Sequence, residues 1–319
     1  MNASADRTAG ADPAPYFQDV AAGPAPDCRW LTAADGAAVR AAFWGGPADA
    51  KGTVLIFPGR TEYVEKYSMT AAAMADRGYA AAAIDWRGQG LTERHGRHRM
   101  LGHVTDFADF QRDADALFAA AEAMALPRPW HLLAHSMGGL IGLRSCLRGL
   151  PIRRVAFSAP MWGVVSLPPR TRMLAWGVSH LAARMGFGDA PVPGSGKAGD
   201  PVDAPFEGNL LTTDAAMFAW MKRQITEHPE LALGGPSLGW LRAALREMRD
   251  VGAMPSPDLP ALMIVGTDEG IVDRAAIDDR LARWPGARLE EVRGARHEAL
   301  MEGPGVRDRL HDALARHFG

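Results

Sequence analysis

A serine between an apolar stretch and a helical stretch constrains this chain more than any other feature. Residues 134–139 read A-H-S-M-G-G, following an apolar run at 130–134 and preceding a predicted helix at 140–150. A strand, a sharp turn with a central serine and a helix form the setting of a nucleophile elbow. The usual pattern has glycine two residues before the serine, whereas Ala134 adds a methyl group there. Alone, the pattern also fits an ordinary strand-to-helix connection.

Strands and helices alternate on both sides of Ser136. A continuous apolar run at residues 53–57 suits a buried parallel strand, and further strands are predicted at 79–84, 130–134, 154–158, 261–265 and 287–292. Helical patterns occupy residues 64–77, 104–124, 140–150, 275–284 and 305–317. Two short runs around Asp35-Gly36 predict a β-hairpin over 28–44. The alternation predicts an α/β fold with a mostly parallel central sheet and helices on both faces.

Composition divides the chain into three parts. Residues 1–27 carry scattered Pro and Gly without periodicity and are expected to form a flexible arm. Residues 161–254 contain four of the nine tryptophans and seven of the fifteen methionines in mainly helical patterns. We therefore expect an α/β core from 28–160 and 255–319, with 161–254 as a helical insertion over the strand ends.

Several classes of protein are disfavoured. A formal charge of -2 gives no support for a nucleic-acid partner. Cys28 and Cys146 offer neither a disulfide framework nor a zinc-ligand set. The first residues lack the order of a signal peptide, and no apolar run of about eighteen residues occurs. A cytoplasmic location is the simplest expectation.

A serine nucleophile needs a base, usually a histidine held by a carboxylate. His297 follows the last predicted strand, at the edge where ligands gather in open α/β sheets, and is the expected base. His311 and His317 lie in the final helix and are expected at the surface. His135 is expected to be structural, because neighbouring strand residues point to opposite faces.

The acid should follow the preceding strand, where Asp268, Glu269 and Asp273 compete. The residues alone do not choose among them, and a simple polar loop fits as well. The oxyanion needs two backbone N–H donors, and Met137 and Arg60 occupy the expected positions. The side chain of Arg60 is expected to be solvated, the alternative being a role near an acyl or phosphate group.

A metal site is disfavoured. Three histidines and an acid lie close together in the sequence, but in a loop dense with arginine. These residues are His95, His98, His103 and Asp106. We expect no metal and no cofactor.

Four motifs together resemble the α/β-hydrolase superfamily and, within it, the branch of bacterial lysophospholipases and monoacylglycerol lipases. They are F-P-G-R at 57–60, D-W-R-G-Q-G-L at 85–91, H-S-M-G-G at 135–139 and G-A-R-H-E at 294–298. The resemblance covers about residues 28–318. The sequence departs from the family pattern at Pro58, where His is usual, and at the acid of the triad, where most members carry Asp. The family pattern lays the acid on Glu269, with Asp268 second, and leaves Asp273 as structural.

The resemblance implies a serine hydrolase that cleaves carboxylic esters of single-chain lipids, a lysophospholipid or a monoacylglycerol, through an acyl-enzyme intermediate. Ser136, His297 and Glu269 would form the catalytic triad, with a helical cap over residues 161–254. Transient contact of the cap with a membrane surface is left open. Alternatives are an esterase, a lactonase or another α/β-hydrolase, such as a hydrolase of carbon–carbon bonds, acting on a small non-lipid substrate, and a non-catalytic binding protein on this scaffold. Dehalogenase and epoxide-opening chemistry would need Asp at position 136.

Overall fold

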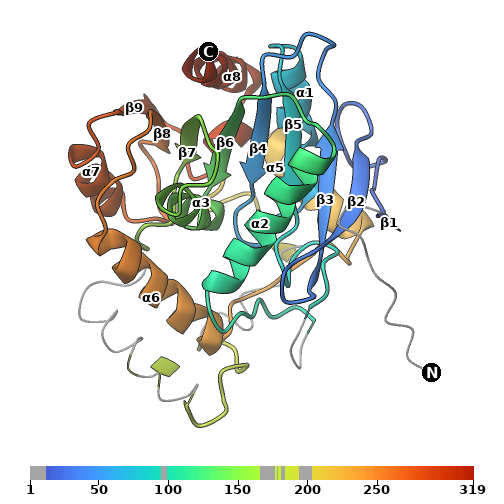
Figure 1. The fold of residues 1–319 in the computed structure, drawn as a ribbon. Coiled ribbons are helices and arrows are strands. Elements are labelled where there is room, and N and C mark those ends of the chain that lie inside the picture. Colours follow the sequence, from blue (N-terminus) through green and yellow to red (C-terminus); the bar gives the residue numbers. More distant parts are fainter. Residues whose placement is uncertain (1–11, 95–98, 166–176, 178, 181–183, 194–202) are drawn as a thin grey trace.

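The central feature of the computed structural model is one nine-stranded sheet (Figure 1). The structure describes residues 12–94, 99–165, 177, 179–180, 184–193 and 203–319. In spatial order the strands are β1 (Asp12–Pro13), β2 (Asp27–Thr32), β3 (Ala38–Trp44), β5 (Ala80–Ile84), β4 (Thr53–Phe57), β6 (Trp130–His135), β7 (Arg154–Ser158), β8 (Ala261–Gly266) and β9 (Ala287–Val292). Strands β4 to β9 are mutually parallel, whereas β1 with β2, β2 with β3 and β3 with β5 pair antiparallel. This confirms the predicted sheet and hairpin.

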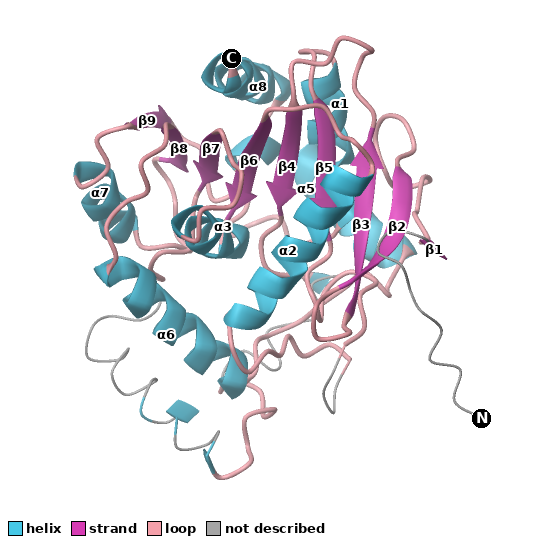
Figure 2. Cartoon of the chain, viewed as in Figure 1, coloured by secondary structure: helices cyan, strands magenta, loops and turns pink. Residues whose placement is uncertain are grey.

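Helices cover both faces of the sheet (Figure 2). One face packs against α2 (Ala108–Ala123), α3 (Met137–Leu147) and α7 (Arg274–Ala282) in a single apolar cluster. The other face packs against α1 (Ser68–Ala75) and α8 (Pro304–Phe318) in a second cluster. Strands buried on both faces need apolar residues, which is why β4 and β5 are almost entirely apolar.

The predicted helices are present with shifted ends. The helix expected over 64–77 opens with a 3-10 turn, η1 (Val64–Tyr67), before α1. The helix expected from 104 begins at Ala108, although Val104 and Phe107 are already buried in the core. Helix α3 begins directly after Ser136, three residues before the predicted start.

The prediction of a flexible arm over 1–27 does not hold for residues 12–26. Val20 is fully buried, the carbonyl of Pro15 accepts a hydrogen bond from Arg40, and Ala22 N–H donates to Ser68. Scattered Pro and Gly hide this segment from pattern reasoning, because buried side chains of the core satisfy its backbone. Residues 1–11 lie outside the described part of the chain.

Two helices, α5 (Ala215–Glu227) and α6 (Leu238–Ala253), occupy the second half of the predicted insertion. Asp214 caps α5 and Ser237 caps α6, each accepting a hydrogen bond from a backbone N–H of the first turn. In Figure 1, α6 lies toward the side to which the arrowheads of β4, β6 and β7 point. Residues 166–176, 178, 181–183 and 194–202 of the predicted insertion lie outside the described residues. Among the helices that are described, none is both long enough and apolar enough to cross a membrane.

Candidate active site

Ser136 lies on a sharp turn between β6 and α3. Its φ of 50° and ψ of -116° fall outside the regions that residues with a side chain prefer. Hydrogen bonds fix this turn on both sides, from Ser136 N–H to the carbonyl of Ser158 at 3.0 Å and from Gly139 N–H to the carbonyl of Ser136 at 2.9 Å. A strained backbone held in this way is typical of functional turns.

Small residues around Ser136 let the turn close. A Cβ on Gly138 would lie 2.1 Å from the carbonyl oxygen of Phe57, so only glycine fits at this position. The unusual Ala134 is accommodated from the opposite side, because a Cβ built on Gly142 would lie 3.0 Å from the Cβ of Ala134. The methyl group of Ala134 thus occupies space that Gly142 leaves free.

His297 is hydrogen-bonded to one of the three candidate acids. Its Nδ1 lies 2.8 Å from Oε2 of Glu269, and both side chains are nearly inaccessible. Burial alone would raise the pKa of the Glu269 carboxyl, but hydrogen bonds from His297 and from the backbone N–H groups of Ile271 and Val272 hold it below its ordinary value.

The other two acids are engaged elsewhere. Asp268 is exposed and accepts a hydrogen bond from Thr267. Asp273 caps α7 by accepting from Ala275 N–H, which is the structural role expected of it. The structure therefore brings Glu269 alone of the three into hydrogen-bond contact with His297.

Ser136 and His297 line one cavity of about 540 Å³. Within the described residues, no hydrogen bond joins the Ser136 hydroxyl to the His297 ring, an arrangement common in ligand-free catalytic sites. Apolar side chains from residues 161–254 form much of the remaining wall; they include Met161, Phe218, Met221, Ile225, Leu233 and Trp240. Ser136 and His297 thus face a largely apolar space.

The two expected oxyanion donors are oriented by different elements. Met137 is the first residue of α3, where backbone N–H groups have no partner within the helix. Arg60 follows β4 in the loop that also contributes Gly59 and Glu62 to the cavity. In the part of the chain that the structure describes, neither backbone N–H donates a hydrogen bond to another residue. Both groups thus remain available to an anionic oxygen.

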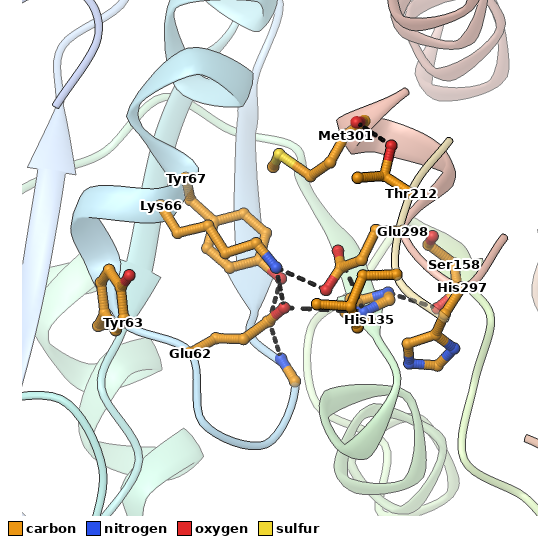
Figure 3. Close-up of polar contacts among 12 residues, drawn as sticks. Glu62, Tyr63, Lys66, Tyr67, His135, Ser158, Thr212, His297, Glu298 and Met301 are labelled. Atoms are coloured by element: carbon orange, nitrogen blue, oxygen red, sulfur yellow. Dashed lines mark hydrogen bonds and ion pairs between the residues drawn. The ribbon is translucent and has the colours of Figure 1, made fainter. Parts of the chain in front are cut away.

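A buried polar network lies beside the cavity (Figure 3), and the sequence analysis did not predict it. The ammonium of Lys66 pairs with Glu298 at 2.6 Å and also with Glu62. The hydroxyl of Tyr67 donates to Glu62 at 2.5 Å. His135 Nδ1 lies 3.0 Å from the carbonyl oxygen of Ser158, while its Nε2 lies 3.5 Å from Glu298. Two features of the sequence point to this network. They are the four-residue spacing of Glu62 and Lys66 and the position of Glu298 next to His297.

The charges of this network stabilise one another. Burial would raise the pKa of Glu298, but Lys66 and His135 bring it well below its ordinary value. Burial would lower the pKa values of Lys66 and His135, but the carboxylates of Glu298 and Glu62 raise both. The result is a charged cluster that rigidly supports the loops of Ser136 and His297.

His135 differs in part from expectation. Its ring lies 4.8 Å from that of His297 and lines the same cavity, although the sequence placed it on the opposite face from Ser136. Strand alternation fails here because Ser136 already belongs to the turn. The role of His135 is nevertheless structural in its contacts. His311 and His317 also differ, since both are buried and not at the surface.

One donor cluster has the composition of a metal site. Glu62, His135 and Glu298 offer ligand atoms within 4.8 Å of one another. The ammonium of Lys66 pairs with both carboxylates and thereby supplies the positive charge that a cation would bring. Of the histidine run considered in the sequence, His95 and His98 lie outside the described residues, and His103 Nδ1 lies 2.8 Å from the hydroxyl of Ser237.

Several known proteins are similar to this chain in sequence or in fold. A family model described as "Serine aminopeptidase, S33" matches residues 48–304. "Lysophospholipase L2" of Escherichia coli is 31% identical over 83% of this chain and 79% of its own length. "Probable lysophospholipase L2" of Haemophilus influenzae is 29% identical over 80% of this chain and 79% of its own. A soluble variant of monoglyceride lipase from Saccharomyces cerevisiae superposes with a TM-score of 0.72 at 21% identity, covering 96% of this chain and 98% of its own.

Proposed function

The chain belongs to the serine aminopeptidase S33 family of α/β-hydrolases, and from that premise we propose that it is a lipid ester hydrolase that uses Ser136 as its nucleophile. The observation that carries the proposal is the opening of the strained Ser136 turn onto a largely apolar cavity that His297, held by Glu269, also lines. The two curated relatives named above support a carboxylic ester as the bond cleaved.

In the proposed mechanism, the Ser136 hydroxyl attacks the acyl carbon while His297 takes its proton. Glu269 holds His297 in the orientation and tautomer that keep the distal ring nitrogen free to accept that proton. The N–H groups of Arg60 and Met137 stabilise the oxyanion, and each such donor is worth about 3 kcal/mol in the transition state. His297 then protonates the leaving alcohol, and water releases the fatty acid from Ser136 by the reverse sequence of proton transfers.

The proposed substrate is a single-chain lipid, either a lysophospholipid or a monoacylglycerol. A cavity of about 540 Å³ with apolar walls from residues 161–254 suits one acyl chain. We propose that these residues act as the cap of the fold, with α5 and α6 forming its described helices. The cytoplasmic location stays a prediction from the sequence.

The family description also names peptide chemistry, which the cavity favours less. An aminopeptidase must hold a protonated amino group, for which an unpaired carboxylate is the natural partner. Among the described cavity residues, Glu62 and Glu298 already pair with Lys66. An ester with an apolar acyl chain needs no such partner.

Hydrolysis of p-nitrophenyl esters from short to long acyl chains tests the proposal. We expect activity to rise with chain length until the cavity is filled, and to vanish in Ser136→Ala. Activity confined to the shortest esters would favour the small-substrate esterase or lactonase. A folded wild-type protein that hydrolyses no ester would favour the binding-protein alternative.

A further inference from the structure

Arg60 carries a positive charge into the cavity wall. Its guanidinium donates one hydrogen bond to the carbonyl of Gly234, in the loop between α5 and α6. The same group lies over the ring of Trp240, with 5.3 Å between Cζ and the ring centroid. Its Nε is buried and has no hydrogen-bond partner. Since a guanidinium offers five N–H donors, most of its capacity is unused by the described residues.

The two fully buried arginines of the described residues are engaged by neighbouring groups. Arg40 pairs with Glu65 and Asp85, each at 2.7 Å. Arg280 donates to the backbone carbonyls of Met254 at 2.9 Å and of Val251. Within the described residues no carboxylate pairs with Arg60, and burial lowers the pKa of its guanidinium to about 10 with no acid to oppose that effect.

Arg60 is partly buried, and a charge partly removed from water without a counterion is costly, so the site is electrostatically incomplete. The other charged groups do not complete it, because Glu62 and Glu298 are already paired with Lys66. Lys222 on α5 adds a second cation to the wall, its ammonium donating to the carbonyl of Ala204 at 3.1 Å. The two cations Arg60 and Lys222 in the cavity wall thus favour an anion.

We propose that the Arg60 side chain binds the phosphate group of a lysophospholipid whose acyl ester lies at Ser136. This inference rests on the proposed lipid ester hydrolysis and selects between its two substrate classes. Planar guanidinium groups bind phosphate oxygens through two parallel hydrogen bonds, and Trp240 holds the plane in place. A monoacylglycerol lacks the phosphate and leaves the charge uncompensated.

The covalent spacing of substrate and protein agrees with this assignment. In a 1-acyl lysophospholipid, the same number of bonds separates the acyl carbon from phosphorus as separates the backbone nitrogen of Arg60 from its Cζ. Because that backbone nitrogen is the proposed oxyanion donor, the acyl carbon would lie beside one end of Arg60. The phosphate would then come within reach of the other end, inside the same cavity.

A selectivity ratio tests the assignment. The kcat/KM for 1-lauroyl lysophosphatidate is divided by that for 1-lauroylglycerol in wild type, Arg60→Met and Arg60→Lys. If a substitution at Arg60 also damages the oxyanion hole, both kcat/KM values fall by the same factor, and their ratio does not change. We expect the ratio to fall about 10- to 100-fold in Arg60→Met, with a smaller fall in Arg60→Lys. An unchanged ratio in Arg60→Met overturns the proposal.

A matched control is Arg112→Met, which removes a half-exposed arginine paired with Asp109 and Asp35, outside this cavity. Its ratio should equal that of wild type. An equal fall in this variant would trace the effect to overall protein charge and also overturn the assignment.

Competition separates a head-group site from a general phosphate site. Hydrolysis of p-nitrophenyl butyrate is measured with sn-glycerol 3-phosphate or inorganic phosphate as inhibitor. Stronger competitive inhibition by sn-glycerol 3-phosphate, lost in Arg60→Met, supports the head-group site. Equal inhibition by sn-glycerol 3-phosphate and inorganic phosphate, or no inhibition by either, overturns the assignment of a head-group site. If the Arg60-dependent inhibition is present but no lipid is hydrolysed, the anion site stands while the proposed lipid function fails.

Discussion

Glu269 holds His297 through one carboxylate oxygen and its own loop through the other. Oε2 lies 2.8 Å from Nδ1 of His297, while Oε1 accepts from the N–H groups of Ile271 at 2.7 Å and Val272 at 3.1 Å. Both oxygens must therefore act as acceptors. A carboxylate satisfies this requirement, whereas an amide has one acceptor oxygen and one donor nitrogen.

Glu269→Gln should consequently disable the base without unfolding the protein. If the amide nitrogen of Gln faces the backbone N–H groups of Ile271 and Val272, donors oppose donors. If the nitrogen faces His297 instead, Nδ1 must accept a hydrogen bond, and the ring takes the wrong tautomer. We expect kcat for p-nitrophenyl esters to fall by about two to four orders of magnitude. Asp268→Asn, which changes an exposed neighbour in the same loop, should keep nearly normal activity. The reverse pattern would move the acid to Asp268.

The Glu298 carboxylate should make stability depend on pH. Its pKa in the folded protein lies well below the unfolded value of about 4.3. A depressed pKa contributes stability that is full above the unfolded value and is lost as pH falls toward the folded value. Glu298→Gln should therefore lower Tm most at pH 5 to 7. The difference from wild type should narrow below about pH 4.3.

Differential scanning calorimetry of the two proteins from pH 7 to pH 3 measures this difference. Glu290→Gln, which alters a carboxylate paired with Arg309 at the surface, is the control and should shift Tm little at any pH. A Tm difference between Glu298→Gln and wild type that stays constant from pH 7 to pH 3 would contradict a depressed pKa of the Glu298 carboxyl.

Lys66 should be coupled energetically to Glu298. Lys66→Met leaves two buried carboxylates without their cation and should cost about 3–5 kcal/mol in the free energy of unfolding. Adding Glu298→Gln removes one of the stranded charges, so the double variant should lose less than the sum of the single losses. Urea unfolding of all four proteins gives the coupling energy. Strict additivity would show that the 2.6 Å contact contributes no coupling.

The predictable parts of this site are those encoded by short, local signals. The Ser136 turn and the His297 loop follow strands that the sequence predicts, and the parallel order of these strands brings their ends to one edge. The contact of His297 with Glu269 also agrees with the position that the family pattern favoured. Their catalytic roles stay predictions until the variants above are assayed.

The unpredicted parts depend on loops that meet only in the folded chain. Lys66 lies 232 residues from Glu298, and no pattern in the sequence links the two. The Arg60 side chain is shielded from solvent by Gly234 and Trp240, which come from the predicted insertion. Tertiary packing therefore turned an expected solvated charge into a partly buried one.

The Ala134–Gly142 contact gives a prediction about the elbow itself. A methyl group added at Gly142 would lie 3.0 Å from the Cβ of Ala134 and 3.0 Å from Cδ2 of Leu132, closer than ordinary packing allows. Overpacking of this kind costs about 1–3 kcal/mol. Replacing glycine by alanine inside a helix raises the free energy of unfolding by about 1 kcal/mol through helix propensity. Gly142→Ala alone should therefore be neutral to clearly destabilising.

The same substitution should behave differently once Ala134 is replaced by glycine. Ala134→Gly removes the opposing methyl group and leaves Leu132 as the one close neighbour, at the flexible end of its side chain. Helix propensity then dominates, and Gly142→Ala should stabilise the Ala134→Gly background. Urea unfolding of the four proteins measures a coupling of about 1 kcal/mol or more. Equal effects of Gly142→Ala in both backgrounds would mean that Ala134 does not pack on α3, and that the elbow tolerates its methyl group for another reason.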